Sequence, residues 1–224
     1  MDTILDIKGL RKTFGPVVAL DKVDVHVTRA NIHFIVGENG AGKSTMMKVI
    51  SGVYPQGSYE GQVLYNGQEC HFNNIKESEK AGIVIIHQEL ALSPYLSIYE
   101  NLFLGNERKK GWLIDWEQTY KDAIGVLLKV GITEDLATPV NKRSVAKQQL
   151  IEIAKALTKN AKVLILDEPT SSLNEHDSAN LLELLKKLKA EGVTIIMISH
   201  KLNEVMAIAD EITIIRDGET IEYI

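Results

Sequence analysis

Residues 37–45 read GENGAGKST and follow the apolar run IHFIV at 32–36. A glycine-rich turn in the pattern Gly37-x-x-x-x-Gly42-Lys43-Ser44, between a strand and a helix, is typical of a phosphate-binding loop. Glycines allow backbone N–H groups to turn toward phosphate oxygens, and the following helix points its positive end at them. Lys43 should reach the outer phosphates, and the Ser44 hydroxyl should ligate Mg²⁺. The predicted nucleotide contacts from this loop are Gly37, Glu38, Asn39, Gly40, Ala41, Gly42, Lys43, Ser44 and Thr45.

Two acidic residues, Asp167 and Glu168, end the apolar run VLIL at 163–166. Ligand sites of α/β proteins lie at the carboxyl ends of their strands. Adjacent strand residues face opposite ways, so both acids can serve one site only if the chain bends, and Pro169 favours a bend. Asp167 should then hold the magnesium, and Glu168 should orient or deprotonate a water aimed at the terminal phosphate.

Two more polar residues follow apolar runs. Gln88 comes after IVII at 83–86 and is predicted to complete the metal and water shell. His200 comes after IIMI at 195–198 and could donate a hydrogen bond to the terminal phosphate. We interpret the neighbouring His87 as structural. A kinase, a molecular switch and a motor would all use such a site, so these residues alone do not distinguish them.

The elements that must position these residues alternate between strands and helices. Strands are predicted at 4–7, 23–27, 61–65, 83–86, 163–166 and 195–198, and a further one at 211–215. Helices are predicted at 43–51, 120–130, 145–157, 175–191 and 202–209. This alternation indicates an α/β fold with a P-loop parallel-sheet core and an N-terminal antiparallel β-layer. Because strand patterns vanish between 98 and 157, we expect residues of about 90–158 to form an inserted helical subdomain, with 1–89 and 159–224 as the catalytic core.

The composition narrows the class of protein. The 224 residues are 45% hydrophobic with a net charge of −5, which argues against nucleic acid as the main partner. A single cysteine, Cys70, excludes an internal disulfide and favours a reducing compartment. The first residues do not resemble a signal peptide, and the apolar runs are too short to cross a bilayer.

Taken in order, these motifs resemble the nucleotide-binding domain of ABC-type transport ATPases. The resemblance also includes KTFG at 12–15, RSVAKQQ at 143–149 and LDEPTSSL at 166–173. It implies that ATP and Mg²⁺ are bound, that Phe14 stacks on adenine, and that Gln88 connects the site to membrane subunits. It further implies a sandwich in which each of two domains offers Ser144, and the loop at 171–174, to the nucleotide of the other. The alternative for Phe14 is an ordinary core position.

One segment departs from the family pattern. The family reads Leu-Ser-Gly-Gly-Gln where this chain has Arg143-Ser144-Val145-Ala146-Lys147, so two side chains stand where the backbone should approach phosphate. Asn174 stands where many members carry aspartate. The altered segment resembles the first half of the double-length ATPases that energise monosaccharide importers. We therefore expect a fragment of a longer polypeptide that binds ATP but hydrolyses it slowly by itself.

The resemblance implies specific partners and a location. They are a second nucleotide-binding domain, transmembrane permease subunits and, indirectly, a periplasmic or extracellular sugar-binding protein. The domain is expected in the cytoplasm, peripheral on the inner face of the cell membrane. Nucleic acid is not expected among its partners. Three alternatives stay open: an ABC-type ATPase acting on nucleic acid or ribosomes, an importer subunit for another solute, and a small-molecule kinase.

Overall fold

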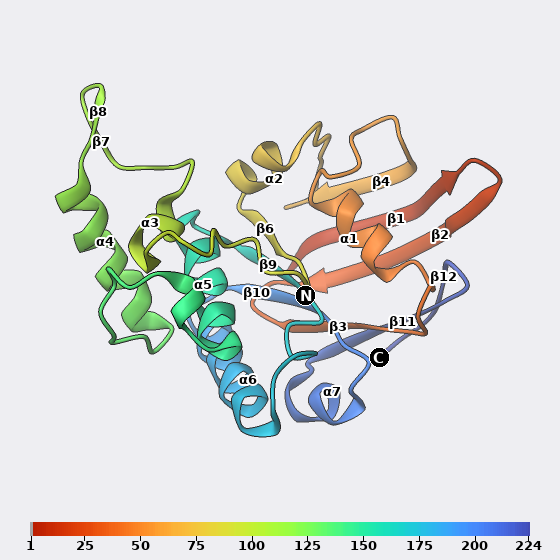
Figure 1. Cartoon of the computed structure of the whole chain (residues 1–224). Helices are drawn as coiled ribbons and strands as arrows, with labels where there is room; N and C mark the ends of the chain where they lie inside the picture. Colours follow the sequence, from red (N-terminus) through yellow and green to blue (C-terminus); the bar gives the residue numbers. More distant parts are fainter. Residues whose placement is uncertain (1) are drawn as a thin grey trace.

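The computed structural model describes residues 2–224, which form a layered α/β arrangement (Figure 1). The strands are β1 (Thr3–Phe14), β2 (Val17–Thr28), β3 (Ile32–Val36), β4 (Glu60–Tyr65), β5 (Gln68–Glu69), β6 (Ile83–Ile86), β7 (Lys109–Lys110), β8 (Leu113–Ile114), β9 (Val163–Asp167), β10 (Thr194–Ile198), β11 (Glu211–Arg216) and β12 (Glu219–Tyr223). The helices are α1 (Lys43–Ile50), α2 (Ile75–Ala81), α3 (Ile98–Phe103), α4 (Trp116–Lys129), α5 (Val145–Thr158), α6 (Glu175–Ala190) and α7 (Leu202–Ile208), with a 3₁₀ turn at Val140–Lys142.

The main sheet has the strand order β12-β11-β3-β10-β9-β6, which confirms the predicted α/β class. All neighbours in it are parallel except β12, which pairs antiparallel with β11. The predicted parallel core is therefore present, and the antiparallel edge strand β12 is an addition for which the sequence analysis gave no prediction. The reason for its antiparallel pairing is the turn Asp217-Gly218, because both residues have positive φ (52° and 81°), which suits a tight hairpin between antiparallel strands.

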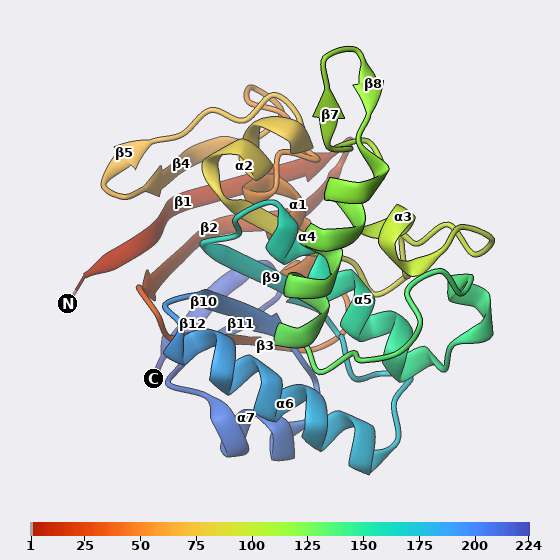
Figure 2. The same cartoon turned by 90° about the vertical axis from the view of Figure 1, so that its left-hand side faces the viewer.

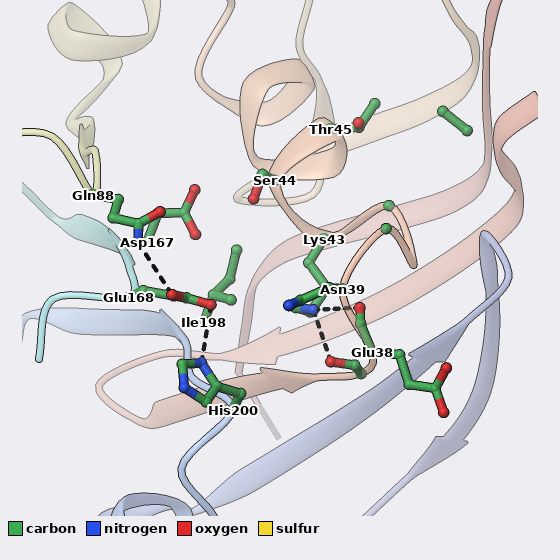
Figure 3. A pocket seen from close by; sticks show the side chains of 14 residues that line it. Glu38, Asn39, Lys43, Ser44, Thr45, Gln88, Asp167, Glu168, Ile198 and His200 are labelled. Atoms are coloured by element: carbon green, nitrogen blue, oxygen red, sulfur yellow. Dashed lines mark hydrogen bonds and ion pairs between the residues drawn. The ribbon is translucent and has the colours of Figure 1, made fainter. Parts of the chain in front are cut away.

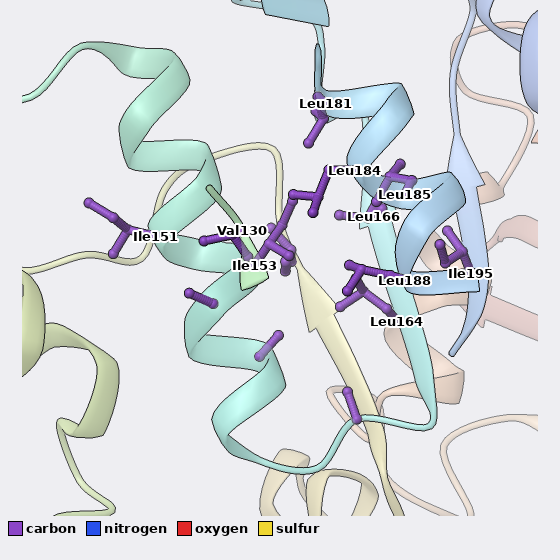
Figure 4. Close-up of a cluster of buried hydrophobic side chains, with 14 of the residues drawn as sticks. Val130, Ile151, Ile153, Leu164, Leu166, Leu181, Leu184, Leu185, Leu188 and Ile195 are labelled. Carbon is purple, nitrogen blue, oxygen red and sulfur yellow. The ribbon is translucent and has the colours of Figure 1, made fainter. Parts of the chain in front are cut away.

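The central strands are covered on both faces, as their nearly continuous apolar sequences predict. Leu164 and Leu166 of β9 pack with α5 and α6 in one buried cluster, which Figure 4 shows from close by. Val163 and Ile165 of the same strand belong to a second cluster on the opposite face, together with α1 and the N-terminal strands. Side chains of a strand alternate between faces, so one short apolar run stabilises two layers.

The N-terminal strands form a separate antiparallel sheet in the order β2-β1-β4-β5, which confirms the predicted β-layer. Strands β1 and β2 each have 12 residues and extend well beyond the predicted ranges. Exposed polar residues in both strands weaken the apolar pattern at their ends. Figure 1 shows this sheet and α1 on one side of the main sheet, with α6 and α7 on the other.

Residues between β6 and β9 contain the helices α3, α4 and α5 and pack beside the main sheet (Figure 2). Capping side chains begin these helices: Ser97 and Glu100 form a capping box on α3, and Asp115 accepts a hydrogen bond from the Gln118 amide at 2.9 Å on α4. The prediction that strands are absent here is wrong, because β7 and β8 form a hairpin. Each of its strands has only two residues, too few for an alternating pattern to be recognised. No helix within residues 2–224 is long and apolar enough to cross a membrane.

A buried polar pair joins β3 to β11. His33 is fully buried, its Nδ1 lies 3.2 Å from Glu211 Oε2, and its Nε2 lies 2.8 Å from Thr213 Oγ1. Burial alone would raise the pKa of Glu211, but hydrogen bonds from His33 and Thr28 outweigh it and lower that pKa to about 2. The carboxylate is therefore stabilised in its charged form in the folded chain.

We expect the contact between His33 and Glu211 to make the stability of the fold depend on pH in the acidic range. Because the folded pKa of Glu211 is about 2 and the ordinary value is 4.5, its contribution is complete above about pH 4.5 and is lost as pH falls toward 2. Glu211→Gln should lower the unfolding free energy by about 1–3 kcal/mol at neutral pH. The difference in unfolding free energy between Glu211→Gln and the parent, measured by chemical denaturation, should shrink as the pH is lowered. The exposed Glu222→Gln on β12 should show no such convergence, and a constant difference for Glu211→Gln would contradict the argument.

Candidate functional site

Most of the predicted site residues converge on one cavity of about 930 Å³ at the carboxyl edge of the main sheet (Figure 3). Parallel pairing aligns the ends of the strands: Ile86 lies beside Leu166, Asp167 beside Ile198, and Ile198 beside Ile35. The segments that follow these strands therefore leave the sheet at the same level. The cavity is lined by Ala19, Gly37, Glu38, Asn39, Gly40, Gly42, Lys43, Ser44, Thr45, Gln88, Asp167, Glu168, Ile198 and His200.

Two glycines of the loop cannot carry a side chain. A Cβ at Gly37 would lie 2.0 Å from the Ile215 carbonyl oxygen. Gly42 has φ +100°, and its Cβ would lie 2.5 Å from Leu20 Cδ2 and 2.6 Å from the Ala19 carbonyl oxygen. Gly42 is also the residue before α1, so this backbone conformation sets the direction from which the helix N-terminus meets the cavity.

Lys43 lies inside the loop, with only 6% of its surface exposed. Its ammonium donates hydrogen bonds of 2.8 Å to the carbonyl oxygens of Gly37 and Glu38. Burial lowers the pKa of Lys43, while the charges of Glu168 and Asp167 act in the opposite direction. The positive charge is thus held inside the loop by two backbone carbonyl oxygens and borders the cavity, where it would attract an anionic group.

Asp167 and Ser44 meet across the cavity. Burial raises the pKa of Asp167, a hydrogen bond with Ser44 lowers it, and the charge of Glu168 raises it again. Hydroxyl, carboxylate and amide oxygens from Ser44, Asp167 and Gln88 are the hard donors that Mg²⁺ prefers. Among residues 2–224 there is no cluster of three or more His, Cys, Asp or Glu that could hold a metal alone. This donor set fits a magnesium that is shared with the phosphates of a ligand.

The bend that brings Glu168 into the cavity is in Glu168 itself. Its φ is +48°, in the left-handed region, and its amide donates a hydrogen bond of 3.1 Å to the Ile198 carbonyl. The residue before a proline avoids the right-handed helical region, so Pro169 contributes to this choice. Glu168 Oε2 accepts a hydrogen bond from Gln88 Nε2 at 3.3 Å, and Oε1 lies 3.1 Å from His200 Nδ1. The carboxylate is therefore held at both oxygens, between two of the other predicted site residues (Figure 3).

Three predicted nucleotide contacts do not line the cavity. Ala41 belongs to the loop, but its side chain is buried. The Phe14 ring is 42% exposed, so it is not a core residue, and it packs edge-on against Tyr54 with 5.4 Å between centroids. Ser144 begins α5, where its Oγ accepts a hydrogen bond from the Lys147 amide, and it faces solvent. Within one chain, Ser144 does not reach the phosphate loop.

Sequence reasoning missed a buried carboxylate behind the site. Glu204 of α7 is 6% exposed, and its Oε2 accepts hydrogen bonds of 2.9 Å from both Thr170 and Ser199. Lys201 Nζ lies 3.4 Å from the other carboxylate oxygen and donates to the Thr170 carbonyl at 2.8 Å. Glu204 thus joins the segment after Glu168 to the segment that carries His200. The signal in the sequence was weak, because a glutamate on a short helix usually faces solvent.

A second missed contact holds the segment after Gln88. Lys155 of α5 donates a hydrogen bond of 3.2 Å to the Ala91 carbonyl. Glu152, one turn earlier, is 7% exposed and accepts a hydrogen bond from the Ala91 backbone. Because α5 begins at Val145, directly after Ser144, one helix links the Gln88 segment to the Ser144 segment.

Comparison with known proteins places this site in a family. The family model described as ABC transporter matches residues 20–171. The chain is 58% identical over 219 residues to the L-arabinose transport ATP-binding protein AraG of Geobacillus stearothermophilus, covering 98% of this chain and 43% of that protein. It is 54% identical over 218 residues to the xylose import ATP-binding protein XylG of Geobacillus kaustophilus (strain HTA426), covering 97% of this chain and 43% of that protein. The chain thus spans less than half the length of these relatives.

Solved structures agree with the match. A nucleotide-free ATP-binding cassette from an ABC transporter has a TM-score of 0.89 at 26% identity, covering 99% of this chain and 90% of that one. The dimeric structure of MJ0796, a bacterial ABC transporter cassette, has a TM-score of 0.83 at 26% identity, covering 99% and 98%. With the family model, the fold and the phosphate loop in agreement, the chain belongs to the ABC transporter family as one of its ATP-binding domains.

Proposed function

We propose that this chain binds ATP in the cavity at the sheet edge and hydrolyses it. The observation that carries the proposal is the position of Glu168, which lies between Gln88 and His200 and borders the same cavity as the phosphate loop. The loop amides and Lys43 bind the phosphates, and Glu168 orients a water toward the terminal one. Gln88 and His200 keep the carboxylate in place. Ser44, Asp167 and Gln88 would hold Mg²⁺, which neutralises phosphate charge when it is bound.

Calorimetry with ATP and measurement of released phosphate test this proposal. We expect one ATP per chain, with binding strengthened by Mg²⁺, and release of free phosphate. Mass spectrometry of the products separates the alternatives, since a small-molecule kinase would transfer the phosphoryl group to an acceptor. Nucleic-acid binding at physiological salt would favour the other soluble ATPase class. Failure to bind ATP would reject the proposal.

We further propose that the ATP is used to import a monosaccharide. The supporting observation is the identity of 54–58% to relatives named for L-arabinose transport and xylose import. The partners are then a second nucleotide-binding domain, permease subunits and indirectly a sugar-binding protein, with the domain on the inner face of the membrane. Uptake of labelled arabinose, xylose and other sugars by cells with and without the gene tests this. Unchanged uptake of every sugar, with lost uptake of another solute, would favour an importer of a different class.

The altered segment after Ser144 should limit hydrolysis by the isolated chain. Val145 is 45% exposed beside the exposed Ser144, so its side chain stands where a partner domain would bring phosphate. The double change Val145→Gly and Ala146→Gly should raise the ATPase rate by up to about 10²-fold, because a well-placed backbone donor can contribute that much. The measurement is ATPase rate against protein concentration. Val145→Ala keeps a Cβ at both positions and should give a smaller gain; a fast parent chain would contradict the prediction.

Glu204 should act by positioning Glu168 and His200. Glu204→Ala leaves the Thr170 and Ser199 hydroxyls without their acceptor, so we expect kcat to fall by about tenfold and KM to change by less than about threefold. Glu204→Gln keeps one oxygen for both hydroxyls and should restore most of kcat. Steady-state kinetics and thermal unfolding are the measurements, with the exposed neighbour Asn203→Ala as control. Equal losses for Glu204→Ala and Glu204→Gln would show that the hydroxyl contacts are not what matters.

A further inference from the structure

The β7–β8 hairpin carries an apolar tip that no part of residues 2–224 covers. It extends beyond the start of α4, away from the phosphate loop and α1 (Figures 1 and 2). Trp112 is 91% exposed at the turn, and the next two residues, Leu113 and Ile114, are 61% and 40% exposed. Single exposed apolar residues are ordinary, but three in a row that include a tryptophan are characteristic of a binding surface.

Two lysines surround this tip. In the antiparallel pairing, Lys110 lies opposite Leu113 and Lys109 lies opposite Ile114. Directly opposite residues share a face of the hairpin, so each face carries one lysine beside one apolar residue. Neither ammonium forms an ion pair in the described part of the chain, whereas the nearby Arg108 is paired with Asp122 at 2.6 Å. The tip thus carries two positive charges outside any ion pair of the described residues, while the nearby carboxylate of Glu107 at the base of the hairpin accepts a hydrogen bond of 2.8 Å from the Gly105 amide, on a chain whose net charge is −5.

The hairpin is held firmly at its base. The Asp115 amide donates a hydrogen bond of 2.8 Å to the Arg108 carbonyl, which closes the loop just below the strands. The Arg108 guanidinium lies 4.9 Å from the centre of the buried Phe103 ring and also binds Asp122 on α4. A tip that is fixed in advance loses little conformational entropy when it binds.

We propose that the β7–β8 hairpin is a lipid anchor that inserts into the surface of an anionic bilayer. Trp112 and Leu113 enter the boundary between headgroups and acyl chains, where an amphipathic indole ring is favoured. Lys109 and Lys110 extend to the lipid phosphates on either face of the hairpin. The two adjacent lysines, which form no ion pair within residues 2–224, complement the negative charge of an acidic headgroup layer. Together with the convex shape of the tip, this favours lipid over a groove on a protein. The anchor goes beyond the proposed function, because it requires neither ATP nor a permease.

The chain supplies its own probe for the experiment. Its two tryptophans are Trp112 and Trp116, so fluorescence excited selectively at tryptophan reports on this hairpin and the first turn of α4. The chain should be titrated with vesicles of phosphatidylcholine alone and with vesicles that also contain phosphatidylglycerol. We expect a blue shift of emission, quenching by brominated lipid and co-sedimentation with the anionic vesicles, all weakened by salt.

Matched variants distinguish lipid binding by the hairpin from nonspecific effects of charge or of exposed apolar residues. Lys109→Glu with Lys110→Glu should reduce partitioning by roughly 30-fold or more, because each lysine near an anionic surface contributes about fivefold. The same reversal at the exposed adjacent pair Lys186 and Lys187 of α6 should have little effect. Trp112→Ala with Leu113→Ser should also reduce partitioning, with Trp116 as the remaining reporter. The apolar control is Leu202→Ser with Met206→Ser on α7, two residues that are 65% and 84% exposed.

Three outcomes would overturn the proposal. They are absence of binding to anionic vesicles, binding that is equally sensitive to the control variants, and burial of Trp112 only when permease-containing membranes are added. The last outcome would assign the hairpin to a protein partner. ATP binding by each variant, measured without lipid, shows that the fold is intact. Because that assay is independent of lipid, loss of the anchor and failure of the proposed ATPase function are distinguishable.

Discussion

Glu168→Gln should leave the affinity for ATP nearly unchanged and reduce its hydrolysis by about 10²–10⁴-fold, which is the usual contribution of a general base. The amide has almost the same shape as the carboxylate, so it can keep the left-handed bend and the contact with Gln88. It cannot take a proton, and it no longer attracts a water through negative charge. The measurements are ATP affinity by calorimetry and phosphate release under saturating ATP.

The control for Glu168→Gln is Glu89→Gln. Glu89 is exposed next to Gln88 but does not line the cavity. The Glu89→Gln variant should bind and hydrolyse ATP as the parent does. If Glu168→Gln hydrolyses ATP at the parent rate, the base is another group and the arrangement of Gln88, Glu168 and His200 has a different purpose.

Lys43→Ala should weaken ATP binding by about 10²-fold, because a charged hydrogen bond to phosphate is typically worth 1.5–3 kcal/mol (about 10–10²-fold) and here it is shielded from water. The fold should persist, since the hydrogen bonds of the side chain are made to the carbonyls of Gly37 and Glu38 in its own loop. Lys43→Arg is a useful companion, because it keeps the charge but adds bulk at a position that is 6% exposed.

Calorimetry and thermal unfolding together test Lys43→Ala. The exposed Lys76→Ala on α2 serves as the matched loss of a lysine and should not change ATP affinity. ATP affinity equal to the parent in Lys43→Ala would remove the loop from the binding site. A large drop in melting temperature would show instead that Lys43 mainly holds the loop together.

The phosphate loop could be predicted from sequence because its chemistry is local. Gly37, Gly42, Lys43 and Ser44 are close in the chain, so their spacing alone indicates a turn before a helix. Helix capping also involves residues that are close in the chain. The Asn174 side chain accepts a hydrogen bond of 2.8 Å from the Asp177 amide at the start of α6. Asparagine and aspartate cap helices comparably well, so the departure from the family pattern at this position costs the helix little.

Other features required the tertiary structure. The hairpin β7–β8 was missed because pairing over two residues leaves no periodic pattern. Glu204 was missed because its partners, Thr170 and Ser199, come from two different loops. The structure also placed Ser144 outside the cavity of its own chain, a separation that no spacing along the sequence reveals.

The sequence by itself determined which short segments carry the chemistry, because residue type and spacing fix a phosphate turn and the end of a strand. Only the tertiary structure decided which of these segments meet. Register along β6, β9, β10 and β3 brings Gln88, Glu168 and His200 to one edge of the sheet. That register follows from burying apolar side chains on both faces at once, which is a property of the whole sheet and not of any one strand.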